Sequence, residues 1–199
     1  MKTQFAPLTG LPVWARHRAA GDAWLGSYFE LGKVEPRLGI FYVEPFALAF
    51  SLELFVKALV GFDDPSFDAK KANHGSAAII KVNTNIPTLE AIAADAELME
   101  IIEEYGKATA FKYGELGMMI DRDEQQKVLD AVLRIRSDLE ERMEKTRPSA
   151  AAITAAVPCS VCNAAAGEHC KFDGDPDVVQ NPPKIHTARI PPGWVNPGP

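Results

Sequence analysis

The residues of this chain that are best suited to specific chemistry are its three cysteines, which lie within twelve residues of one another. Cys159 and Cys162 form a Cys-x-x-Cys pair, and Cys170 follows eight residues later. His186 lies beyond a loop rich in Gly, Asp and Pro. Three thiolates and one imidazole are a ligand set typical of tetrahedral zinc. We therefore predict that one zinc ion is bound by Cys159, Cys162, Cys170 and His186.

Two alternatives to this ligand set concern the fourth ligand and the chemistry of the sulfur atoms. His169 could replace His186, but it adjoins Cys170 and would crowd the same face of the ion. A redox-active Cys-x-x-Cys pair would leave Cys170 and His186 without a role. Because four protein ligands leave no position for water, we expect the zinc to be structural and not catalytic.

The cysteine segment contains three motifs: Pro158-Cys159-Ser160-Val161-Cys162, Gly167-Glu168-His169-Cys170 and His186-Thr187-Ala188-Arg189. It resembles a small zinc-binding domain found in proteins of actinobacteria and their phages. The resemblance implies that the module contacts nucleic acid, DNA or RNA, and that three basic residues bind phosphate: Lys171, Lys184 and Arg189. With three basic and four acidic residues, the module would bind weakly by itself. Alternatively, Arg189 pairs with one of the aspartates of the loop, Asp173, Asp175 or Asp177.

A second group of polar residues occurs in the helical part of the sequence. Glu53 and Lys57 stand four residues apart in an otherwise apolar segment, a spacing that allows a salt bridge along a helix. The segment Ser51-Leu52-Glu53-Leu54-Phe55-Val56-Lys57-Ala58, with His74-Gly75 and Lys112-Tyr113, resembles the signature of a HEPN domain, an α-helical bundle. The resemblance extends over about Val13 to Met143. It implies that a polar cluster of Glu53, Lys57 and His74 holds the bundle together or lines a ligand-binding cleft.

Ribonucleases of the HEPN family carry an Arg-x4-6-His motif, in which the histidine transfers a proton and the arginine stabilises charge on phosphorus. No arginine precedes any of the four histidines of this chain at that distance. The sequence therefore favours a protein that is not an enzyme. In the alternative, a divergent ribonuclease, the active residues would be His74, Lys71, Lys112 and Tyr113.

The elements that must position these residues are helices. Apolar periodicity and capping residues predict five helices, over residues 13–31, 45–60, 74–82, 88–105 and 121–145. The composition changes near Arg147-Pro148, since nine of the 15 prolines lie between Pro148 and Pro199. We therefore predict an all-α protein with a HEPN-like bundle (13–147), a linker (148–156), a zinc module (157–190) and a Pro/Gly-rich tail (191–199).

Composition limits the possible partners and compartments. The net charge of −6 and the pI of about 5.3 argue against a protein that coats duplex DNA through its overall charge, so any contact must be local. The beginning of the chain lacks the pattern of a secretory signal, and three cysteines with Cys-x-x-Cys spacing indicate a reducing cytoplasm. The most apolar segment, residues 46–62, contains Glu53 and Lys57, so we expect a buried core helix and no membrane span.

Three functions follow, in order of preference. The first is a non-enzymatic nucleic-acid-binding protein with a structural zinc module, whose helical domain serves in homodimerisation or ligand sensing. The second is the divergent HEPN ribonuclease. The third is a protein-interaction component of a phage or toxin–antitoxin system, in which the Phe- and Leu-rich helix forms a dimer seam.

Overall fold

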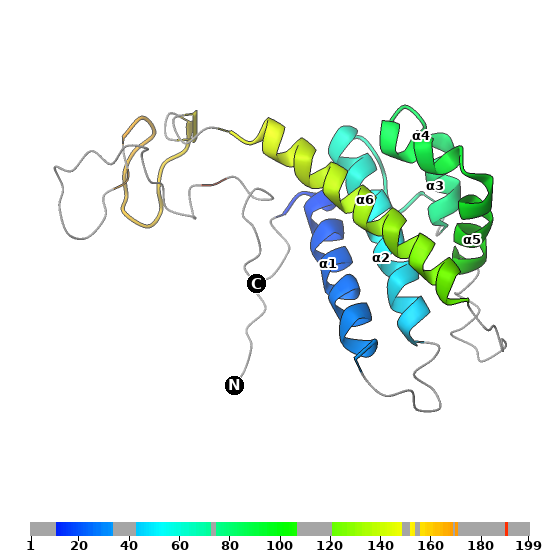
Figure 1. Ribbon diagram of the computed structural model, residues 1–199. Coiled ribbons are helices and arrows are strands. Elements are labelled where there is room, and N and C mark those ends of the chain that lie inside the picture. Colours follow the sequence, from blue (N-terminus) through cyan, green and yellow to red (C-terminus); the bar gives the residue numbers. More distant parts are fainter. Residues whose placement is uncertain are drawn as a thin grey trace. The chain divides into compact units, whose positions relative to one another are not determined.

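The computed structural model describes residues 11–33, 43–72, 75–106 and 121–148, and in the C-terminal part residues 152–153, 156–168, 170 and 190. These residues form helices and no strand, which confirms the all-α class. The principal helices are α1 (Val13–Leu31), α2 (Val43–Asp63), α3 (Ser76–Val82), α4 (Pro87–Ala93), α5 (Ala96–Gly106) and α6 (Arg122–Thr146) (Figure 1). The chain divides into two compact units, Val13–Glu141 and Met1–Pro12 with Arg142–Pro199.

The core of the helical unit is built around α2, which packs along α1 (Figure 1). The two helices approach closely at Gly21, where a Cβ atom would lie 3.2 Å from the ring of Phe55. There the Ser51 hydroxyl donates a hydrogen bond of 3.1 Å to the Gly21 carbonyl. The largest side chains that are fully buried come from α2 to α6 and the turn before α4: Leu48, Leu52, Phe55, Leu59, Ile80, Ile86, Leu89, Ile92, Ile102, Ile135 and Leu139.

Helix α6 follows its predicted pattern closely. Val128, Val132, Ile135 and Leu139 step by three or four residues, and all four are completely buried. At the start of the helix, the carboxylate of Asp121 accepts a hydrogen bond of 2.9 Å from the Asp123 N–H, as expected of a capping residue. The polar side of α6 is tied to α1 and α5 by ion pairs, among them Arg136–Asp22 and Lys127–Glu97.

The predicted helix over residues 88–105 is wrong in one respect, because the structure divides it into α4 and α5. The break falls at Ala94 and Asp95, and the Asp95 carboxylate accepts a hydrogen bond of 3.0 Å from the Leu98 N–H. An aspartate binds the open N–H groups of a first turn better than it fits a helix interior, so a new helix begins there. Helix α2 is longer than predicted at both ends, and α3 begins at Ser76 instead of residue 74.

Among the described residues, one segment, Glu44–Asp63 of α2, has the length and composition of a helix that could cross a membrane. The core helix of a folded domain meets the same criteria. In this structure 61% of the segment's most apolar window is buried inside the protein, with Leu48, Phe55 and Leu59 completely covered. This burial agrees with the prediction of a core helix.

Candidate metal centre

The three cysteines come together in the C-terminal unit. Their Sγ atoms all lie within 4.8 Å of one another, with Cys159 buried and Cys162 and Cys170 partly exposed. All the cysteines of the chain are described, and none forms a disulfide. In a tetrahedral site with Zn–S bonds of about 2.3 Å, the sulfurs are separated by about 3.8 Å. A zinc ion therefore fits this group, and its three soft donors favour zinc over a hard cation such as magnesium.

The backbone between the first two cysteines forms a tight turn. The N–H of Cys159 donates a hydrogen bond of 2.8 Å to the carbonyl of Ala164, which closes the loop. Asn163 directly follows Cys162 and has a φ of 55°, in the left-handed region. Asparagine tolerates this conformation better than most residues. Asn163 was not among the predicted site residues, although an asparagine next to a Cys-x-x-Cys pair indicates a turn.

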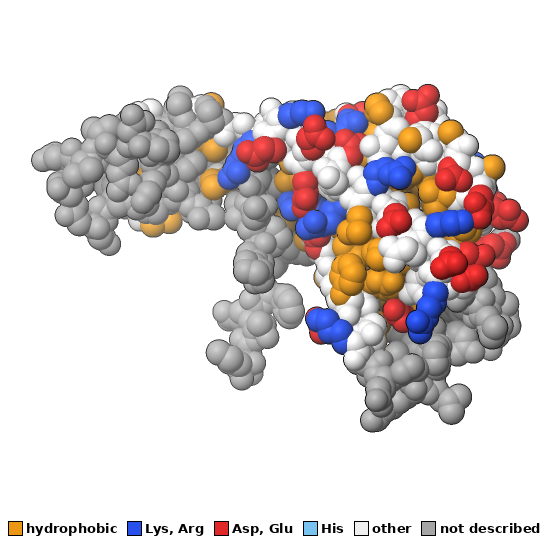
Figure 2. Space-filling model, viewed as in Figure 1, with side chains coloured by type: hydrophobic (Ala, Val, Ile, Leu, Met, Phe, Trp, Pro, Cys, Tyr) orange, Lys and Arg blue, Asp and Glu red, His pale blue; other side chains and the backbone are white. Residues whose placement is uncertain are grey.

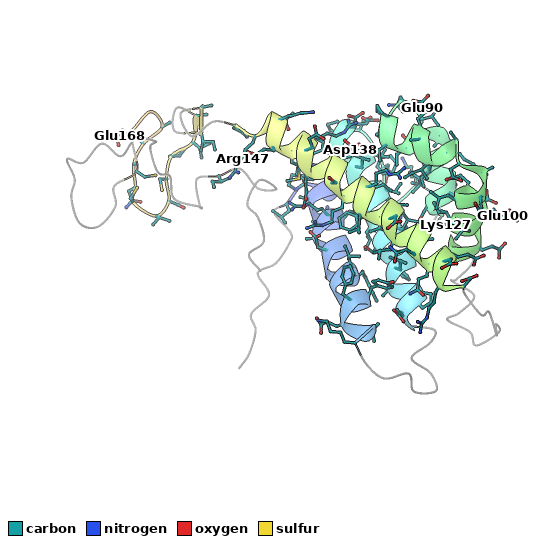
Figure 3. The ribbon with its side chains drawn as sticks, viewed as in Figure 1. Glu90, Glu100, Lys127, Asp138, Arg147 and Glu168 are labelled. Atoms are coloured by element: carbon teal, nitrogen blue, oxygen red, sulfur yellow. The ribbon has the colours of Figure 1, made fainter. Side chains whose placement is uncertain are left out.

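A second turn returns the chain toward Cys170. Gly167 has a φ of 88°, a left-handed conformation that requires the freedom of glycine. The Glu168 N–H donates to the Ala165 carbonyl at 3.0 Å, and the Ala165 N–H donates to the Glu168 carboxylate at 2.9 Å. The glutamate, labelled in Figure 3, therefore fixes this turn through its own side chain.

Several predicted site residues lie outside the described part of the chain. They are the two candidate fourth ligands, His186 and His169, and the three candidate phosphate contacts, Lys171, Lys184 and Arg189. Their roles stay predictions. Within the described segment 156–168 and at Cys170, Glu168 is the one acidic residue and no Lys or Arg is present. The described part of the module is therefore a metal-binding loop, and any basic contacts come from other residues of the domain.

The polar pair of the helical unit is present and mostly buried. Lys57 donates a hydrogen bond of 2.6 Å to Glu53, and their side chains are 6% and 17% exposed. His74, Lys112 and Tyr113 lie outside the described residues, whereas Lys71 is 86% exposed and pairs with Asp68 at 3.4 Å.

The structure also places His17, which sequence analysis left unassigned, near this pair. Burial lowers the pKa of His17, the positive charges of Lys57 and Arg16 lower it further, and Glu53 partly opposes them. His17 and Lys57 are 40 residues apart and meet only because α1 packs on α2, so no local sequence signal connects them.

Comparison with known proteins bears on the C-terminal part of the chain. Residues 132–197 match a family model described as "Putative DNA-binding phage zinc finger domain". No curated protein and no solved structure matches the chain. The HEPN resemblance of the helical unit therefore stays a prediction.

The matched region is wider than the zinc module predicted over residues 157–190. It begins at Val132, inside α6, and includes all three clustered cysteines. The family match and the clustering of the three thiols both indicate zinc binding in this region. The C-terminal part of the chain is thus a zinc-binding module similar to the zinc-finger domains of phage proteins.

Proposed function

We propose that this protein binds DNA through its C-terminal zinc module and that the zinc is structural. The observation that carries the proposal is the convergence of Cys159, Cys162 and Cys170 within a region that matches the family described as "Putative DNA-binding phage zinc finger domain". His186 completes the tetrahedron, and the closed site has no catalytic position. The ion orders a loop that would not hold its shape unaided.

The charge distribution of the helical unit supports a contact made by the module. On the face shown in Figure 2, Lys and Arg side chains of the helical unit are interspersed with Asp and Glu, without a continuous basic surface. Several of these cations are engaged in ion pairs, such as Lys127 with Glu97 and Arg136 with both Asp22 and Glu140. A chain of net charge −6 repels DNA as a whole. The attraction therefore comes from a few local residues, for which Lys171, Lys184 and Arg189 are the candidates.

The zinc dependence of DNA binding tests this proposal. Fluorescence anisotropy with a labelled duplex, at constant pH and a series of salt concentrations, should give a slope of log K against log salt of about −3, corresponding to three phosphate contacts. Cys159→Ser should abolish binding because it removes a zinc ligand. Ser160→Ala changes an exposed neighbour that is no ligand and should bind as the wild type does. Undiminished binding by Cys159→Ser would overturn the proposal.

The same titration with single-stranded DNA and with RNA of the same sequence defines the nucleic acid. We expect DNA to bind more tightly than RNA, because the matching family is described as DNA-binding. Labelled RNA incubated with the pure protein also tests the ribonuclease alternative. We expect no cleavage, because the Arg-x4-6-His motif is absent.

For the helical unit we keep the predictions from sequence: a HEPN-like bundle that serves in homodimerisation or ligand sensing, in a cytoplasmic protein. The mass of the protein in solution tests the dimer, and a pull-down tests the alternative of a phage or toxin–antitoxin component. A monomer at micromolar concentration would remove the dimerisation role.

A further inference from the structure

A pocket of about 780 Å³ opens in the helical unit, between the first turns of α1, the middle of α2 and the turn that follows α2. Its charged lining consists of Arg16, Lys57, Lys70 and Asp68, and His17 also faces it. Lys57 is offset by Glu53 and Asp68 is offset by Lys71. The positive charges of Arg16 and Lys70 therefore remain. This local positive charge is opposite in sign to the net charge of the chain, which is −6.

The acidic groups near the pocket are already engaged. Asp68 accepts a hydrogen bond from the Lys70 N–H at 3.0 Å and pairs with Lys71 at 3.4 Å. Glu53 accepts the hydrogen bond of Lys57. Arg16 and Lys70, by contrast, form no ion pair with any residue that the structure describes. The two exposed cations therefore keep their charge available to a ligand.

Two polar groups that line the pocket are buried. Lys57 is only 5% exposed and uses one of its three N–H groups on Glu53. The Nε2 atom of His17 is buried and has no hydrogen-bond partner among the described residues. Leaving a buried polar atom unsatisfied costs about 1–3 kcal/mol, so a ligand that supplies the missing partner is favoured. The first turn of α1 contains no acidic residue, and the partial positive charge of the helix N-terminus adds to the attraction.

We infer that this pocket binds a small molecule that carries a phosphate group. A phosphomonoester dianion matches the two remaining positive charges, those of Arg16 and Lys70. Its several oxygens can accept hydrogen bonds from Lys57, His17 and Arg16 together. The volume lies within the range of about 300–1,000 Å³ that is usual for small-molecule sites and exceeds what a phosphate alone would fill. Val13, Phe67 and Ala69 provide an apolar surface for the rest of the ligand. This site is independent of the zinc module.

The imidazole of His17 provides a direct reporter of binding. The zinc-loaded full-length protein is titrated with inorganic phosphate, with adenosine monophosphate and with adenosine, at constant ionic strength, while the histidine ring resonances are followed by NMR. His17→Gln identifies the His17 signals. We expect a saturable shift of these signals with phosphate, tighter binding of adenosine monophosphate because its nucleoside also contacts the apolar surface, and no shift with adenosine.

Adjacent lysines provide the matched variants. Arg16→Gln and Lys70→Gln should each weaken binding about threefold, and the double variant about tenfold, because exposed charges contribute little individually. Lys71→Gln alters the exposed neighbour that does not line the pocket and should stay within about twofold of the wild type. These exposed substitutions should leave the fold intact, which circular dichroism checks. The absence of a saturable His17 shift, or equal losses in Lys70→Gln and Lys71→Gln, would overturn the inference, whereas the DNA assay would be unaffected.

Discussion

The helical unit and the zinc module maintain their structures by different means. Eleven large side chains are fully buried in the helical unit, where apolar burial provides the main stabilisation. In the described residues of the module between 156 and 170, only Cys159 and Ala164 are buried. A segment with so few buried apolar side chains cannot by itself offset the loss of chain entropy, and a metal is the usual substitute. The two units therefore rely on different stabilising agents, and we expect that each agent can be removed without loss of the other unit's structure.

Removal of zinc should produce the largest effect, and it should be confined to the module. Structural zinc contributes about 10 kcal/mol or more of apparent folding free energy in small zinc domains. A strong chelator should therefore abolish the dispersed NMR signals of residues 157–170, while the helical circular dichroism keeps its intensity. Elemental analysis should find one zinc ion per chain before chelation. A protein without metal, or a chelator that unfolds α1–α5 as well, would show that the two units are not stabilised separately.

Truncation of Phe55 should destabilise the helical unit and leave the zinc module intact, the opposite of zinc removal. Phe55→Ala opens a cavity at the contact between α1 and α2 and should lower the free energy of unfolding by about 3–5 kcal/mol. Urea denaturation measures this loss, and the zinc content of the still-folded protein should stay at one ion per chain. Phe29→Ala is the control, because this ring is 45% exposed and its removal should cost much less. Equal losses for the two rings would contradict the proposed core.

The buried ion pair of α2 should be sensitive to removal of one partner. Lys57→Met takes away the ammonium that offsets the Glu53 carboxylate and should destabilise the helical unit by about 3 kcal/mol. The double variant Glu53→Gln/Lys57→Met should recover most of this stability, since it leaves no charge at the site. Lys33→Met breaks an exposed pair of the same 2.6 Å length and should leave the urea midpoint unchanged. A double variant as unstable as Lys57→Met would show that the lysine acts through packing alone.

The smallest effect concerns the turn of the metal-binding loop. Asn163→Ala places a residue that disfavours positive φ at this position and should weaken zinc binding by about 1 kcal/mol. Asn163→Gly accepts the same backbone conformation and should bind zinc about as well as the wild type. Competition with a chromophoric chelator measures both affinities. Stronger binding by the alanine variant than by the glycine variant would show that the left-handed turn is unimportant for the metal site.

The sequence was most informative where local patterns determine the outcome. The bounds of α1 and the buried stripe of α6 follow from helical periodicity, and cysteine spacing was sufficient to predict that three thiols gather. The break at Asp95 was missed because an aspartate within an apolar pattern supports either a continuous helix or a new cap. The position of His17 near Lys57 depends on how two helices pack, which no short motif encodes.

Helix α6 has a consequence for how such a module can be transferred between proteins. The family match starts at Val132, yet Val132, Ile135 and Leu139 are completely buried in the helical unit. If the module were excised at Val132, this chain would lose part of its helical core. The protein that received the module would carry the apolar side of α6 exposed to water. A cut after Thr146 would spare the donor but discard the first residues of the matched domain. A chimera made from this chain therefore needs either an apolar surface in the receiving protein that covers these α6 side chains, or polar substitutions at their positions.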